Sequence, residues 1–235
     1  MKVAIMQPYF FPYLGYFSIM KYTDKWIVLD EVQFIRHGWI ERNRILKPED
    51  GWQYISVPLE KHSRDTLIKE ISIRNNENWK EKIFRQLEHY KKVAPYYQST
   101  IEFLREALSF NTNSITQLNV HLMIETCKLL DIKINLAVFS EMELQIAPVK
   151  KPGDWALNIS KAVNASEYVN PPGGVSLFDK KAFKDAKIDL LFLDLELLSY
   201  RQGERPFESA LSMVDVLMFN TYYEINRMLD NYKII

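Results

Sequence analysis

The stretch Lys2–Tyr16, KVAIMQPYFFPYLGY, decides the fold of this chain. Its first five residues, Lys2–Met6, form a short apolar strand pattern, and the next ten contain two prolines and five aromatic residues. Because proline fixes φ and lacks a backbone N–H, Pro8 and Pro12 should hold this segment as a rigid, non-helical loop. In open α/β sheets, a loop that connects a parallel strand to its helix faces the ligand.

Strand and helix patterns alternate along much of the chain, which is typical of an α/β protein. We expect strands at 2–6, 25–30, 52–57, 67–73, 134–139, 166–170 and 188–194. Over about 76–131, apolar residues recur at helical spacing through three successive helices, and Asn111–Ser114 should form the turn and N-cap before the third. The sequence therefore predicts a mainly parallel, Rossmann-like sheet with flanking helices. We expect one domain over 1–235, with 76–131 as a helical insertion or cap.

Composition excludes several classes of protein. The 235 residues are 47% hydrophobic, enough for a sizeable core, and 30 basic residues balance 30 acidic ones. No global charge therefore favours nucleic acid or an anionic membrane surface. No apolar run approaches the ~18 residues of a membrane helix, and the start lacks a signal-peptide pattern. We expect a cytoplasmic protein without membrane insertion; whether it forms a homo-oligomer stays open.

The cysteine and histidine content argues against a zinc centre, whereas a divalent ion held by carboxylates such as Asp30 and Glu31 together with a substrate phosphate stays open. The single Cys127 excludes an intrachain disulfide and a cysteine zinc site, and its helical surroundings favour a buried structural thiol. His89 and His121 lie in helical patterns without a partner at ligand spacing. We therefore expect no structural zinc, and the sequence identifies no cofactor.

The aromatic loop supplies the first group of candidate binding residues. Gln7 follows the first strand directly, and its amide can both donate to and accept from a base edge or a sugar hydroxyl. Tyr9, Phe10 and Tyr13 offer faces on which a planar group can stack. The alternative is that these aromatic residues belong to the core, which we favour for Phe11.

The second group follows the strand at 25–30. Asp30, at its end, is a candidate catalytic residue that can hydrogen-bond a ribose, orient an attacking amine or hold a metal ion. His37 is a candidate general base, because its ordinary pKa of ~6.5 lies near neutrality. Arg42 and Arg44 flank Asn43, and arginine binds phosphate bidentately, so the three form a plausible clamp for a diphosphate. A salt-bridged surface loop is the alternative.

Two later segments add candidates. Lys61 follows a strand pattern and is a candidate phosphate contact. Asn170, Gly173 and Gly174 lie after another strand pattern, where paired glycines let backbone N–H groups approach an anion. The segment lacks the lysine and third glycine of the common nucleotide-binding loops, and a simple tight turn is the alternative. Ser212 reads as a helix N-cap.

Four blocks, in order, resemble the WbqC-like protein family: MQPYFFPYLGYF (6–17), GWIERNRIL (38–46), YVNPPGG (168–174) and LSMVDVLMFN (211–220). The resemblance spans essentially the whole chain. It implies a role in the biosynthesis of bacterial O-antigen or other surface polysaccharides, without naming a reaction. It also supports Lys61 and adds Gln202 as a candidate substrate-binding residue. Many relatives carry histidine at the position of Met6, so we give Met6 no catalytic role.

Three functions stay open at this point. The first is an enzyme that modifies a nucleotide-activated sugar, for example by acyl or aminoacyl transfer to an amino sugar, with an Asp or His as base and amides or arginines facing the oxyanion. The second is a nucleotidyltransferase-like enzyme, although the His-x-Gly-His signature is missing. The third is a non-catalytic protein that binds glycan precursors or scaffolds a complex. The expected small-molecule partner is a nucleotide-sugar or an acyl donor.

Overall fold

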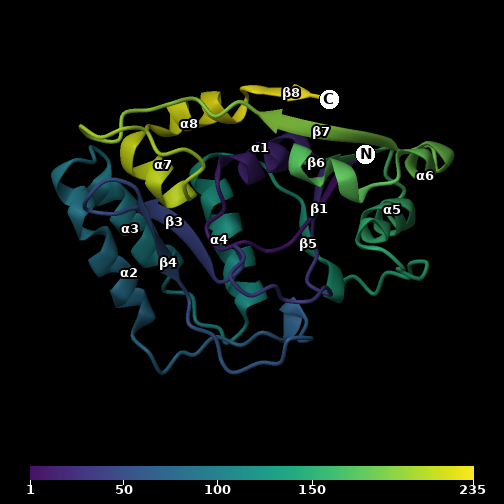
Figure 1. The fold of residues 1–235 in the computed structure, drawn as a ribbon, viewed down its shortest axis with the longest axis horizontal. Helices are drawn as coiled ribbons and strands as arrows, with labels where there is room; N and C mark the ends of the chain where they lie inside the picture. The colour runs from purple at the N-terminus through teal and green to yellow at the C-terminus, as the bar shows by residue number, and fades with distance from the viewer.

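A six-stranded sheet forms the centre of the fold in the computed structural model, which describes residues 1–235 (Figure 1). Its strand order is β5-β2-β1-β6-β7-β8. The first five of these run parallel, and β8 pairs antiparallel with β7. This arrangement confirms the predicted mainly parallel α/β fold. The strands are β1 (Lys2–Met6), β2 (Lys25–Val28), β5 (Leu136–Val138), β6 (Glu167–Asn170), β7 (Asp189–Leu195) and β8 (Tyr232–Ile234).

Helices cover both faces of this sheet. Because side chains alternate along a strand, Ala4 of β1 faces a core shared with four helices, α1, α4, α7 and α8. Val3 and Ile5 face the opposite core, which is shared with α5 and α6. The helices are α1 (Leu14–Tyr22), α2 (Trp79–Leu87), α3 (Tyr97–Ala107), α4 (Ile115–Leu129), α5 (Pro152–Ala162), α6 (Lys180–Asp185), α7 (Met213–Phe219) and α8 (Tyr222–Leu229). Four 3-10 turns are η1 (Ile68–Glu70), η2 (Glu88–Lys92), η3 (Phe139–Glu141) and η4 (Pro172–Leu177).

A second, antiparallel pair of strands, β3 (Arg42–Leu46) and β4 (Trp52–Ser56), lies with α2 and α3 beside the main sheet (Figure 1). These elements and one side of α4 enclose the largest core cluster, of 28 buried residues. The helices α2, α3 and α4 fall within the predicted helical segment 76–131. Ser114 caps α4 as expected, since its Oγ accepts a hydrogen bond from the N–H of Gln117 at 3.3 Å.

Two strand predictions were wrong or incomplete, and two strands were not predicted. The segment 67–73 is not a strand but contains η1, and its backbone makes only isolated bridges to neighbouring loops. The strand predicted at 52–57 exists as β4, but it pairs with β3 rather than with the main sheet. The sequence does not predict β3 as a strand, because its inward positions begin with Asn43 and its outward positions are Arg42 and Arg44. The sequence also does not predict β8, because its three residues are too few for their alternation to mark a strand.

Candidate functional site

The strand order reverses next to β1. The strands β2 and β5 lie on one side of β1, whereas β6 and β7 lie on the other. In open α/β sheets, ligands bind in the crevice at the carboxyl ends of the strands where this reversal occurs. A cleft of about 540 Å³ lies at this place, lined by Gln7 after β1 and by Asn170 at the end of β6. Gln7 and Asn170 therefore share one edge of the sheet and one cleft, as the sequence predicted.

The walls of this switch-point cleft come from three segments. Leu29 and the residues after it form one wall, and the start of α5 with Trp155 forms another. Leu177 and Phe178 at the end of η4 close the third side. Lys150 and Lys151 line the cleft, are exposed, and take part in no ion pair. The cleft thus combines apolar walls with two cationic side chains available to a ligand.

The turn that carries the two lysines is fixed by Asp154. One carboxylate oxygen, Oδ2, accepts hydrogen bonds from the backbone N–H groups of Lys150 (2.8 Å) and Lys151 (2.9 Å). These bonds lower the pKa of Asp154. Gly153 lets the start of α5 approach η4, because a Cβ at this position would lie 2.1 Å from the carbonyl oxygen of Leu177. The start of α5 is therefore held as one wall of the cleft.

The amide of Gln7 is free to meet a ligand. Gln7 is half-buried, and its side chain makes no hydrogen bond within the chain. Its backbone carbonyl accepts a hydrogen bond from the hydroxyl of Tyr16 at 3.3 Å, which helps to fix the position of the residue. A free amide in a half-buried cleft can donate and accept at the same time, as the edge of a nucleobase or a sugar hydroxyl requires.

Asn170 is held from two sides. Its Nδ2 donates to the hydroxyl oxygen of the buried Tyr168 at 2.7 Å and contacts the Sδ of Met6 at 3.6 Å. Its Oδ1 lies against Gly174, where a Cβ would come within 2.4 Å of it. Gly174 therefore makes room for the Asn170 amide. Its own N–H donates to the carbonyl of Pro171, so it is not free to bind an anion as we had expected.

Gly173 differs from its neighbour. It is exposed, and a Cβ built on it would meet no atom within 4 Å. It does not line the cleft. The two glycines thus have different environments, although their sequence positions suggested one shared role.

A second, smaller cavity of about 150 Å³ lies beside the aromatic loop, and two residues of that loop line it. It is lined by Tyr9, Tyr13, Trp39, Asn43, Arg44 and Ala210. The guanidinium of Arg44 lies 5.3 Å from the ring centre of Trp39 and 5.2 Å from that of Trp52, and one of its N–H groups donates to the carbonyl of Ala210 at 3.0 Å. Arg44 is therefore largely occupied by contacts within the protein.

Arg42 and His37 lie outside both cavities. Arg42 stacks on Tyr54 at 3.9 Å from the ring centre and donates to the carbonyls of Gly38 (3.3 Å) and His37. The predicted clamp of Arg42, Asn43 and Arg44 is thus not formed in this structure. Successive residues of a strand point to opposite faces, so Asn43 faces away from the two arginines, and each arginine binds its own aromatic and carbonyl partners. His37 is exposed, in a loop with φ of 63°.

Three predicted residues are buried and hold the fold. The carboxylate of Asp30 is 1% exposed and accepts hydrogen bonds from the N–H (3.1 Å) and hydroxyl (2.7 Å) of Ser140, which joins the ends of β2 and β5. Phe10 is fully buried, so its ring cannot stack on a ligand. The Nδ2 of Asn43 donates to the carbonyls of Phe10 (3.0 Å) and Phe11 (2.8 Å). Asp30 is therefore not presented to the cleft as a catalytic group.

Gln202 belongs to a buried network around Asp215. Its Nε2 donates to Oδ2 of Asp215 at 3.0 Å, and the hydroxyls of Tyr90 and Tyr200 donate to the same carboxylate at 2.5 and 2.6 Å. Gln202 is 1% exposed, so it has no access to substrate. Lys61 is exposed and lies outside the cleft. Ser212 caps α7 as predicted, with its hydroxyl accepting from the N–H of Val214.

The prediction that Gln7, Asp30, Arg42, Asn43 and Asn170 line one pocket is wrong, since only Gln7 and Asn170 do. Sequence reasoning also missed Lys150, Lys151 and Trp155. A signal for them was present: two lysines directly precede Pro152, and proline is favoured in the first turn of a helix. The sequence could therefore have predicted a helix that begins at Pro152, with Lys150, Lys151 and Trp155 as candidate binding residues at its start.

Comparison with known proteins assigns the chain to a family. It belongs to the WbqC-like protein family, whose sequence pattern matches residues 7–227. It is 30% identical over 222 residues to the uncharacterized protein Rv1507c of Mycobacterium tuberculosis, and the match covers 93% of each chain. No solved structure matches it significantly. None of its helices combines the length and the apolar character needed to cross a bilayer.

Proposed function

We propose that this protein is an enzyme of bacterial surface-polysaccharide biosynthesis that binds a nucleotide-activated sugar in the switch-point cleft. The observation that carries the proposal is the convergence, at the carboxyl ends of β1 and β6, of the free amide of Gln7 with the unpaired Lys150 and Lys151. Family membership supports the biosynthetic role, and the position of the cleft supports the nucleotide.

The size, charge and aromatic lining of the cleft suit a nucleotide-sugar. Its volume of about 540 Å³ lies within the roughly 300–1,000 Å³ of small-molecule sites. The two lysines provide positive charge for a diphosphate. Gln7 is placed to recognise a base edge or a sugar hydroxyl, and Trp155 and Phe178 give apolar surface for rings. In this proposal Lys150 and Lys151 at the start of α5, and not Arg42 and Arg44, bind the diphosphate.

Acyl or aminoacyl transfer to an amino sugar is the reaction we propose. The attacking amine must lose a proton as its nitrogen forms a bond to the acyl carbon and the donor's leaving group departs. Glu31 is the one carboxylate that lines the cleft, and it forms an ion pair with Lys69 at 2.6 Å. We assign the role of proton acceptor to Glu31, in place of the buried Asp30.

The test has two stages. The protein is first heated in the presence of UDP-, GDP-, CDP- and dTDP-sugars. A ligand at a hundred times its Kd stabilises the native state by about 2.7 kcal/mol, which raises Tm by about 5–11 °C for a chain of this size. If none of these nucleotide-sugars raises Tm, the proposal fails.

In the second stage, the binding nucleotide-sugar is incubated with acetyl-, aminoacyl- and other acyl donors, and products are followed by mass spectrometry. We expect Glu31→Gln to bind the nucleotide-sugar as the parent protein does but to lose turnover. Binding without turnover by the parent protein would favour a non-catalytic role, and release of pyrophosphate would favour a nucleotidyltransferase.

A further inference from the structure

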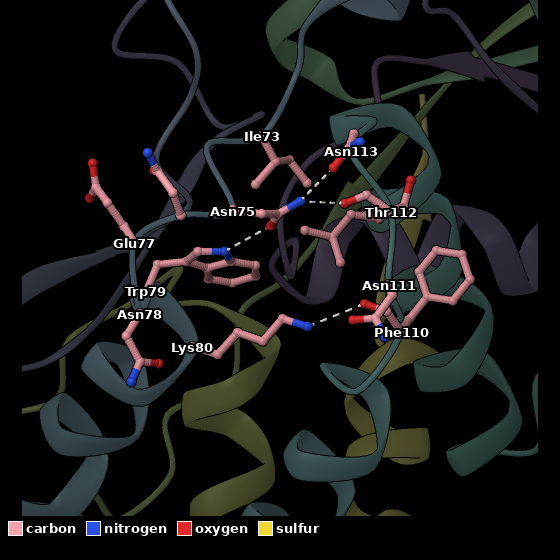
Figure 2. A pocket seen from close by; sticks show the side chains of 12 residues that line it. Ile73, Asn75, Glu77, Asn78, Trp79, Lys80, Phe110, Asn111, Thr112 and Asn113 are labelled. Carbon is pink, nitrogen blue, oxygen red and sulfur yellow. Dashed lines mark hydrogen bonds between the residues drawn. The ribbon is translucent and has the colours of Figure 1, made fainter.

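A separate cavity, of about 590 Å³, lies between the turn before α2 and the turn before α4. Figure 2 shows the Trp79–Lys80 side of this cavity facing the Phe110–Thr112 side across an open space. None of its lining residues lines the switch-point cleft. The twelve residues that line it include five asparagines, at 75, 76, 78, 111 and 113.

Hydrogen bonds across the two turns hold this cavity open. The Nδ2 of Asn75 donates to the carbonyl of Thr112 (2.9 Å) and to Oδ1 of Asn113 (2.8 Å), and its Oδ1 accepts from the indole N–H of Trp79 at 3.3 Å. The ammonium of Lys80 reaches the carbonyl of Phe110 at 3.3 Å. Figure 2 shows the bonds of Asn75 to Thr112 and Asn113, and that of Lys80 to Phe110, joining the two sides. The frame is therefore formed before any ligand arrives.

Three other asparagines of the cavity have side chains that make no hydrogen bond to the protein. The side-chain amides of Asn76, Asn78 and Asn111 make no hydrogen bond within the chain, and Asn78 does not cap α2 although it stands at the N-cap position. Asparagine is common in turns because its amide bonds to nearby backbone, but these three amides do not serve that purpose. Each presents a paired donor and acceptor to the solvent.

An aromatic ring and a balanced charge complete the cavity. Phe110 lines it, is 37% exposed, and is supported from behind by His121, whose ring is stacked on it with centres 4.3 Å apart. The charged lining residues are Lys80 and Glu77, and Glu77 is already paired with Arg74 at 2.8 Å. The lining residues therefore carry no net charge, and the one cation among them without an ion pair, Lys80, already donates to the carbonyl of Phe110.

We propose that this asparagine-rich cavity is a binding site for a neutral carbohydrate. Amides satisfy vicinal hydroxyls as donor and acceptor together, and the exposed face of Phe110 suits the apolar face of a pyranose ring. The volume is sufficient for one or two sugar units. The proposal does not depend on the nucleotide-sugar site, because the two cavities share no residue.

The test is a titration followed by NMR on isotope-labelled, full-length protein. The probes are the neutral methyl glycosides of glucose, galactose, mannose, rhamnose and N-acetylglucosamine, with glucuronic acid and glucose 6-phosphate as anionic comparisons. We expect at least one neutral glycoside to shift the backbone amide signals of 75–80 and 110–113 in a saturable way. The nucleotide-sugar should leave these signals unchanged.

Asn111→Ala removes one free amide without touching the bonds of the frame, so Tm should stay the same while affinity for the glycoside falls about threefold to tenfold. Asn135→Ala, at another exposed asparagine, is the matched control and should change neither. The proposal is overturned if no neutral glycoside shifts these signals, if an anionic sugar binds more tightly, or if Asn111→Ala binds as the parent protein does.

Discussion

Replacing Gly174 by alanine should damage the switch-point cleft, whereas the same change at Gly173 should not. A Cβ at position 174 would lie 2.4 Å from Oδ1 of Asn170 and 3.1 Å from a ring carbon of Phe178. Favourable contacts between heavy atoms lie near 3.5–4.0 Å, so the Asn170 amide must move by roughly 1 Å. A Cβ at position 173 would meet no atom within 4 Å.

The magnitude follows from what that movement breaks. Asn170 donates to the hydroxyl of Tyr168 at 2.7 Å, and Tyr168 is 1% exposed. A buried polar group that loses its partner costs about 1–3 kcal/mol. For a chain of this size, 1 kcal/mol corresponds to about 2–4 °C in Tm, so Gly174→Ala should lower Tm by about 2–12 °C. Gly173→Ala should be neutral, or stabilising by up to about 1 kcal/mol through the unfolded state.

Two assays on the matched pair test this reasoning. Thermal unfolding gives the stability difference, and titration with the nucleotide-sugar that stabilises the parent protein gives the affinity. We expect Gly174→Ala to lose about tenfold in affinity, because the displaced Asn170 lines the cleft. If Gly174→Ala and Gly173→Ala have the same Tm and the same Kd, the close packing at Gly174 has no role in the site.

Three further predictions concern buried or capping groups. Asp215→Ala leaves the hydroxyls of Tyr90 and Tyr200 without their acceptor, so it should lower the free energy of unfolding, measured by chemical denaturation, by about 2–5 kcal/mol. Tyr200→Phe should lower it by less, and equal losses would contradict a network centred on Asp215. Burial raises the pKa of Cys127 to about 12, so iodoacetamide at pH 8 should alkylate it only after denaturation, and rapid alkylation of the native protein would show the thiol to be accessible. Because the pKa of Asp154 is lowered in the folded protein, its carboxylate contributes to the free energy of unfolding above pH 3.8, its ordinary pKa, and this contribution is lost as the pH falls through the lowered pKa. Asp154→Asn should therefore make the free energy of unfolding depend less on pH at acid pH. An unchanged slope below pH ~4 would show that the Asp154 carboxylate does not cap this turn.

The sequence predicted most of the main sheet because five of its six strands are short, largely apolar runs. β1, β2, β5, β6 and β7 all fall within one or two residues of the predicted segments. What it could not predict was pairing: β4 had the same pattern as the others, yet its partner is β3, whose alternation is hidden by Asn43. Pairing depends on contacts between distant segments, which a local pattern does not contain.

The candidate site was predicted in part for a similar reason. Gln7 and Asn170 follow directly from strand ends, and parallel strands place such residues at one edge. Asp30 also follows a strand, but Ser140 of the neighbouring segment takes up its carboxylate, which sequence spacing cannot reveal. Other predicted polar residues bind the protein's own backbone instead of facing the cleft. Asn43, for example, donates to the carbonyls of Phe10 and Phe11 in the aromatic loop.

The central claim, that the switch-point cleft binds a nucleotide-sugar through the α5 wall, is tested most directly by calorimetric titration of one double variant. Lys150→Ala/Lys151→Ala removes both exposed lysines of the cleft, and loss of two charge-assisted contacts of about 1.5–3 kcal/mol each predicts at least a hundredfold weaker binding of the nucleotide-sugar. Lys161→Ala/Lys184→Ala removes the same charge from exposed positions away from the cleft and should bind as the parent protein does. Equal affinity of the two double variants would contradict the account.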